Sequence, residues 1–154
     1  MPPTPLPTYT DILALTSYLP RLYADGITLV EWVANPGQFP YPNYAPVVSE
    51  FFHLAGRPCW CDYHYGSALA GKRLQDPEFI RVCGLAEIKI LLTFCVRGER
   101  FSSGHWAAVI EKGYIRHILE RLTELLEQMK ISPLESNAKD SFDSIPPDGV
   151  RRDE

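Results

Sequence analysis

The chain has 154 residues, of which 45% are hydrophobic and 12% aromatic, and its formal net charge is −4 at pH 7. This length predicts one domain, and the apolar content suffices for a core without disulfides or metals. The negative charge argues against a general nucleic-acid coat protein, which depends on excess basic residues, although it is compatible with a local basic patch.

The first residues and the cysteines bear on where the protein works. The chain carries four cysteines and begins MPPTPLP, which has neither the basic nor the apolar part of a secretory signal. We therefore expect a cytoplasmic protein with reduced thiols. The apolar run over residues 90–96 is far shorter than the roughly 20 residues that span a bilayer, so we predict no membrane association.

Prolines and acidic residues mark the two ends of the chain. Four of the fourteen prolines fall within the first seven residues, so residues 1–8 are expected to form an extended lead-in. Residues 131–154 carry three basic and six acidic side chains, a net charge of −3. They bury too little apolar surface to offset the entropy of ordering, which predicts a flexible acidic tail after a single helical domain over residues 9–130.

The first elements of the domain are a helix and an extended segment. A helix capped by Thr10 is expected over residues 10–23, because residues 12, 15, 19 and 22 form one apolar stripe. Residues 27–34 are β-branched and aromatic, which is typical of a short strand. Residues 35–43 are rich in proline and contain two aromatic residues, so a packed loop is predicted there.

The rest of the domain is predicted to be helical. Pro46 and Gly56 bracket one helix, Asp76 is placed to begin another, and Ser103 is placed to cap a third. After the helix over 10–23, the main expected helices cover residues 45–55, 85–97, 104–112 and 114–129, the last with a regular apolar stripe, and shorter helical segments are expected over residues 67–75 and 77–82. The predicted fold is mainly α, a compact array of five or six helices with at most one short strand or hairpin.

The segment LLTFCVRGERFSSGHWAAVIEKGYIRHILERLTEL, residues 91–125, resembles the C-terminal core of a bacterial family of unknown function. The resemblance implies a shared fold and no reaction. This chain differs from the family pattern at two places: Ser103 stands where the family has an acidic residue, and Cys61-Asp62-Tyr63 replaces an Asp-Trp step. A function that required that acidic residue or that tryptophan is not implied for this chain. The matching residues are Leu91, Leu92, Thr93, Val96, Arg97, Arg100, Phe101, Gly104, His105, Glu111, Gly113, Ile115, Ile118, Leu119, Arg121 and Leu122.

Four polar residues of this segment make a candidate anion site. Arg97 lies one helical turn after Thr93, and Arg100 and His105 flank a loop that ends at a helix N-terminus. Guanidinium, imidazole and free backbone N–H groups suit phosphate or carboxylate. In the structural alternative the arginines pair with Glu99, Glu111 or Asp62, and His105 caps or packs.

An aromatic-rich region comes earlier in the chain. Stacking surfaces near arginines suit a nucleotide ring, and Trp60 and Tyr63 are the candidate ligand-binding residues among them. The alternative is an aromatic core under two proline-rich loops. The full set is Phe39, Tyr41, Tyr44, Trp60, Tyr63 and Tyr65.

Metal and thiol chemistry are weaker hypotheses. Cys59, Cys61, Asp62 and His64 form a single C-x-C cluster, with His53 upstream, and structural zinc sites usually need a second pair of ligands. No sequence motif supports a catalytic cysteine activated by a histidine. We therefore predict neither a metal nor a cofactor.

Three functions remain open. The leading hypothesis is a non-enzymatic binding or regulatory module that recognises a small anion or nucleotide through Thr93, Arg97, Arg100 and His105. The second is an enzyme acting on a phosphoester or nucleotide, with His105 as its acid–base group. The third is a protein-interaction domain, for which a homodimer through the last helix is one form.

Overall fold

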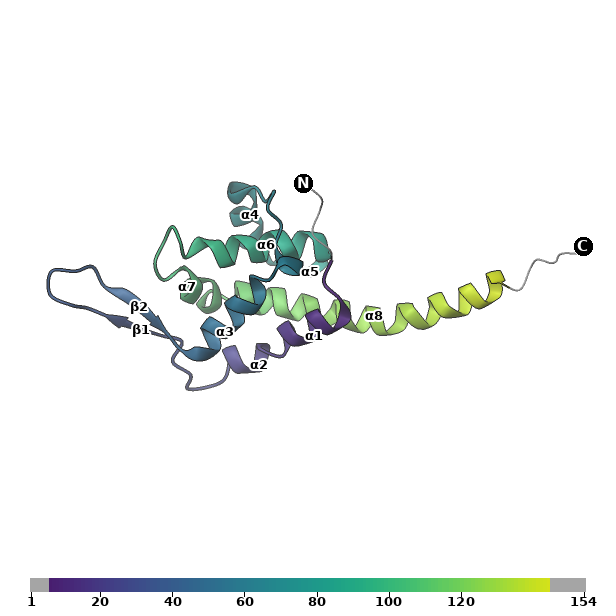
Figure 1. Cartoon of the computed structure of the whole chain (residues 1–154), viewed down its shortest axis with the longest axis horizontal. Helices are drawn as coiled ribbons and strands as arrows, with labels where there is room; N and C mark the ends of the chain where they lie inside the picture. Colours follow the sequence, from purple (N-terminus) through teal and green to yellow (C-terminus); the bar gives the residue numbers. More distant parts are fainter. Residues whose placement is uncertain (1–5, 145–154) are drawn as a thin grey trace, which may run out of the picture.

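The computed structural model describes the backbone of residues 6–144 and the side chains of residues 6–130. Figure 1 shows a body of helices from which one hairpin projects at one end and the last helix at the other. The elements are α1 (Tyr9–Thr16), α2 (Leu19–Leu22), β1 (Val30–Val33), β2 (Tyr41–Tyr44), α3 (Pro46–Ala55), the 3-10 turn η1 (Pro58–Trp60), α4 (Ser67–Leu74), α5 (Pro77–Val82), α6 (Leu85–Gly98), α7 (His105–Glu111) and α8 (Tyr114–Ser144).

The prediction of a mainly α fold with one hairpin is confirmed, but the helix count of five or six is wrong. The described part of the chain contains seven helices of six residues or more, together with the four-residue turn α2. Short connections let neighbouring short helices form separately. Asp76, for example, caps α5 by accepting hydrogen bonds from the N–H groups of Glu78 and Phe79.

The first predicted helix is in fact two helices with a different cap. Thr8, not Thr10, precedes α1, and the Thr8 and Asp11 side chains each accept a hydrogen bond from the other's backbone N–H. Pro20 lies in the first turn of α2, where its missing N–H is tolerated. A continuous helix over residues 10–23 would have placed Pro20 in its interior, so the chain breaks before it.

The strand predicted within residues 27–34 is confirmed as β1. Residues 35–40 form a loop as predicted, but residues 41–43 belong to β2 and the loop is not packed. β1 pairs with β2 in an antiparallel hairpin that places Val33 opposite Tyr41. Gly37 turns the chain with φ +76°, and Phe39 at the tip is 92% exposed. A projecting hairpin brings too few neighbours to the tip to bury an aromatic ring.

The core lies where α8 packs against α1, α5 and α7, with α6 on α3, α4 and α7. The predicted stripe of α8 faces it: Ile118 and Leu122 are fully buried, whereas Leu125 is only partly buried. Each fully buried Leu or Ile stabilises the fold by about 1.5–3 kcal/mol relative to exposure. Core burial therefore fixes α8 beside the helices that carry the site.

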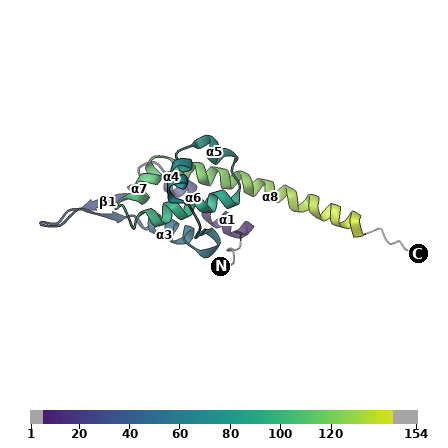
Figure 2. The same cartoon turned by 90° about the horizontal axis from the view of Figure 1, so that it is seen from above.

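Helix α8 is longer than the predicted span of residues 114–129. Its backbone continues to Ser144, and Figures 1 and 2 show this part extending beyond the other helices. Residues 1–5 of the predicted lead-in and 145–154 of the predicted tail lie outside the described residues. Among the described helices, none combines the length and the hydropathy needed to cross a bilayer.

Candidate functional site

The N-terminus of α7 is occupied by a carboxylate of the chain itself. Gly104 precedes the helix with φ +88°, and the Gly104 N–H donates to Oε2 of Glu99 at 3.0 Å. The Trp106 N–H donates to Oε1 of the same residue at 2.9 Å. The backbone groups expected to be free for a ligand are therefore already bonded, and Glu99 rather than Ser103 satisfies this helix end.

Glu99 also ties the hairpin to this helix. The Tyr44 hydroxyl donates to Glu99 Oε1 at 2.8 Å, and the Tyr44 ring lies 5.3 Å from the Trp106 ring between centroids. Burial is the main cause, and the hydrogen bond to Glu99 the second, of a Tyr44 pKa well above its usual range. The phenol therefore stays protonated and keeps donating its hydrogen bond to Glu99. One carboxylate thus holds β2 and the start of α7 together.

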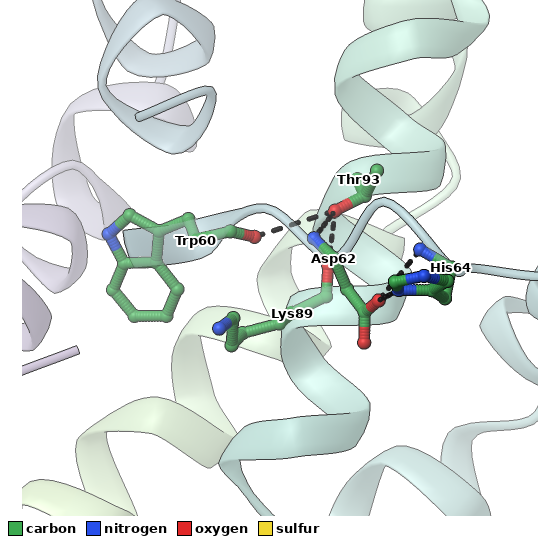
Figure 3. A network of polar contacts seen from close by, with 5 residues as sticks. All are labelled: Trp60, Asp62, His64, Lys89 and Thr93. Atoms are coloured by element: carbon green, nitrogen blue, oxygen red, sulfur yellow. Dashed lines mark hydrogen bonds and ion pairs between the residues drawn. The ribbon is translucent and has the colours of Figure 1, made fainter. Parts of the chain in front are cut away.

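Thr93 joins α6 to the connector before α4, as Figure 3 shows. Its buried hydroxyl donates to the Lys89 carbonyl at 2.7 Å and accepts from the Asp62 N–H at 2.9 Å. The Asp62 carboxylate in turn accepts from the His64 N–H at 2.9 Å. Trp60 next to it is 1% exposed and belongs to the core. Thr93 and Trp60, two of the predicted ligand-binding residues, therefore lie away from solvent.

The two arginines have no carboxylate partner among the described residues. The Arg97 guanidinium lies over the Tyr65 ring, 5.8 Å from its centroid, and its Nε is buried without a hydrogen-bond partner. Arg100 is exposed in the loop between α6 and α7. The pairs with Glu99, Glu111 or Asp62 that the structural alternative required are not formed in the described part of the chain.

His105 is packed between α6 residues at the first position of α7. Its ring meets Phe94 edge to face at 5.4 Å, and a Cβ at position 98 would overlap the ring, so Gly98 is required for this approach. The Nε2 atom is buried without a hydrogen-bond partner. Burial lowers the pKa of His105, and the nearby Glu99 carboxylate opposes that shift, so the imidazole is neutral at pH 7.

Phe94, Gly98 and His105 border a groove of about 450 Å³ between the start of α4, the end of α6 and the loop before α7. We call it the aromatic groove. A second hollow of about 190 Å³ shares Phe94 and His105 with it. The aromatic groove is lined by Tyr65, Ser67, Phe94, Gly98, Phe101, Ser102 and His105, and the Phe101 ring is 80% exposed at its mouth.

One family model matches this chain over residues 7–128, which is nearly all of the helical body. The chain belongs to DUF6508. DUF6508 is described as a family of unknown function, which confirms the resemblance to a family without an assigned activity. No curated protein and no solved structure matches the chain. The match therefore gives this DUF6508 chain a family but no reaction.

The cysteine–histidine cluster of the DUF6508 chain does not converge. The Cys61 thiol contacts the Gly56 carbonyl at 3.3 Å, and His53 is exposed on α3. Burial raises the pKa of Cys59 and of Cys61, which keeps both thiols protonated. Among the residues that the structure describes, no group of three or more His, Cys, Asp or Glu side chains could hold a metal ion.

The predicted site residues of this DUF6508 chain fall into three sets. His105 lines the aromatic groove, whereas Arg97 does not line it, although its guanidinium lies over the ring of Tyr65, which does. Tyr63 and Arg100 are exposed but do not line it, and Thr93 and Trp60 are buried. Glu99, Phe94, Gly98 and Phe101 have roles here that were not predicted from the sequence, where Gly98 next to a charged loop was the only local signal.

Proposed function

We propose that this chain is a cytoplasmic, non-enzymatic binding module that takes a small planar anion, such as a nucleotide, in the aromatic groove. The observation that carries the proposal is a groove with three aromatic rings beside a guanidinium, that of Arg97, which pairs with no described carboxylate. Rings supply a stacking surface, and the guanidinium supplies the charge that selects an anion.

The shape and polarity of the groove favour a ring system. Its volume of about 450 Å³ lies within the roughly 300–1,000 Å³ typical of small-molecule sites. Tyr65, Phe94 and Phe101 provide apolar walls, while Ser67 and Ser102 provide hydroxyl groups. A planar ligand buried between such rings gains roughly 1–3 kcal/mol per stacked base. A bare inorganic anion would leave these walls unused.

The unpaired arginines favour a negative charge on that ring system. An unpartnered buried donor such as Arg97 Nε costs about 1–3 kcal/mol, and a ligand oxygen within reach would recover that cost. Arg100 belongs to the same loop as Phe101, so it adds a second positive charge near the mouth. Because Glu99 fills the α7 N-terminus, the arginine side chains and not the helix dipole would hold the anion.

An enzyme acting on phosphoesters is the second candidate. Burial lowers the pKa of His105, so at pH 7 its imidazole is neutral and able to accept a proton. In that role Arg97 and Arg100 would stabilise developing charge. We rank it second because His105 forms no hydrogen bond to another titratable group among the described residues, whereas the binding proposal needs none.

Calorimetric titration of the full chain with AMP and with flavin mononucleotide tests the binding proposal. We expect one or both to bind more tightly than adenosine or inorganic phosphate alone, because ring and charge are recognised together. Arg97→Gln should weaken binding at least about tenfold, a loss of about 1.4 kcal/mol. Arg116→Gln is the matched control, since Arg116 also lies over a tyrosine ring, that of Tyr23, but far from the groove lining.

Two results would contradict the binding proposal. One is no binding of either nucleotide at millimolar concentration. The other is equal weakening by Arg97→Gln and Arg116→Gln, which would mean that the ligand responds to overall charge and not to the aromatic groove.

A further inference from the structure

The two outer edges of the hairpin differ in their ability to accept another strand. The Ala45 N–H donates to the Leu29 carbonyl at 2.9 Å, and hydrogen-bonded positions alternate along an antiparallel pair. In the register that places Trp32 opposite Pro42, the backbone N–H and C=O groups of Val30 and Trp32 therefore point away from β2. No other group of the described residues bonds them.

Proline protects one edge and leaves the other open. Pro42 occupies the corresponding outward position of β2, and it has no N–H to offer, so β2 is a poor template for a further strand. Val30–Val33 contains neither proline nor lysine, the residues that usually block an edge. In Figure 1 the hairpin projects from the helices, and none of the described segments runs along the outer side of β1.

We propose that β1 pairs with β1 of a second copy of this chain, forming the four-stranded antiparallel sheet β2–β1–β1–β2. The inference is independent of any ligand in the aromatic groove. An antiparallel strand pairs with its own copy around a two-fold axis, the commonest symmetry of homo-oligomers. Because the hairpin projects from one end of the body, this axis places the two helical bodies at opposite ends of the joined sheet.

Charge and face alternation select the register of this pairing. Paired residues must share a face of the joined sheet, and only Val30, Trp32 and the residue at position 34 offer outward backbone groups. Centring the axis on Glu31 would set two like charges directly opposite each other, which is unfavourable. Centring it on Val33 would set Val30 opposite Pro36, which has no N–H to donate. Centring it on Trp32 sets the two Trp32 rings side by side and places Glu31 opposite Val33 of the second copy.

The exposure of Trp32 fits this register. Its ring is 51% exposed although one edge lies against Gly104, where a Cβ would come within 2.7 Å of the ring. The contact with Gly104 holds the ring in place, and the exposed half is available to the second copy. Because the paired segment is only four to five residues long, we expect a weak dimer whose population depends on concentration.

Sedimentation of the full chain over a concentration series, with two matched substitutions at one position, tests the proposal. In the proposed register Val33→Lys places a cation opposite Glu31 of the second copy, and Val33→Glu places an anion there. Two symmetric pairs of this kind predict a dimer dissociation constant at least roughly fourfold lower for Val33→Lys than for Val33→Glu. Both variants place a long charged side chain two residues from Glu31 on the same face of its own strand, so circular dichroism and the melting temperature of each monomer serve as the control for changes within the hairpin.

A second measurement is independent of these variants. In amide hydrogen exchange of the wild-type chain, the N–H groups of Val30 and Trp32 should become protected as concentration rises, while those of Glu31 and Val33 are protected throughout. A chain that stays monomeric at millimolar concentration overturns the proposal. So does a dimer that ignores the charge at position 33 and leaves Val30 and Trp32 unprotected, because its interface must then lie elsewhere, for example on α8.

Discussion

Glu99 is the residue whose removal should most affect the region around the aromatic groove. Its carboxylate accepts from two backbone N–H groups at the start of α7 and from the Tyr44 hydroxyl. Hydrogen bonds to charged groups contribute about 1.5–3 kcal/mol each, and Glu99 is only partly buried, so water recovers part of the loss. We therefore expect Glu99→Ala to lower the free energy of unfolding by roughly 2–4 kcal/mol.

The assay is urea denaturation of the full chain, supported by a thermal melt. For a chain of this size, roughly 2–4 °C of melting temperature corresponds to each kcal/mol, so a decrease of roughly 4–16 °C is expected. Glu111→Ala is the matched control, because Glu111 is an exposed carboxylate at the other end of α7 without an ion pair among the described residues.

A comparison of the two variants decides whether Glu99 occupies the helix end. If Glu99→Ala lies within about 0.5 kcal/mol of Glu111→Ala, the Glu99 carboxylate does not stabilise α7, and the reasoning about an occupied N-terminus is refuted. Glu99→Gln should lie between the two, because the amide keeps one acceptor oxygen but loses the charge.

Three further predictions concern residues with defined surroundings. Leu122→Ala should lower the free energy of unfolding by roughly 2–5 kcal/mol in urea titration, because Leu122 is fully buried; a loss below about 1 kcal/mol would contradict that packing. Thr93→Val should cost about 1–3 kcal/mol by the same assay, since the partly buried Asp62 N–H loses its acceptor, whereas a neutral effect would mean that water replaces it. Folding lowers the pKa of His105 below its unfolded value of 6.5, so the unfolded chain binds more protons at this residue, and the stability should fall as pH drops below about 6.5. His105→Phe should flatten this dependence, measured as the melting temperature from pH 8 to pH 5.

Helix boundaries with local signals could be predicted from the sequence. Pro46 in the first turn of α3 and Gly56 after its end are both found, because proline is tolerated in a first turn and the helix needs only its own residues to define these limits. The cap of α5 by Asp76 was predictable for the same reason. The apolar stripe of α8 predicted the buried face since helical periodicity alone determines it.

The parts that depended on distant residues were not predictable. Tyr44 and Gly104 meet at Glu99 although about sixty residues separate them, and no local pattern marks such a contact. Strand β2 contains Pro42, which argues against a strand unless its outward position in the hairpin is known. His105 lines the aromatic groove, but the groove itself depends on Phe94 and Phe101, to which the sequence alone assigned no role in a site.

The most direct test of the binding proposal is an NMR titration of the full, isotopically labelled chain with AMP. We expect saturable shifts in the backbone amides of Gly98, Ser102 and His105, which line the aromatic groove, and little change at Arg116 and His117 on α8. Shifts confined to α8, or none up to millimolar AMP, would contradict the proposal that the aromatic groove recognises a planar anion.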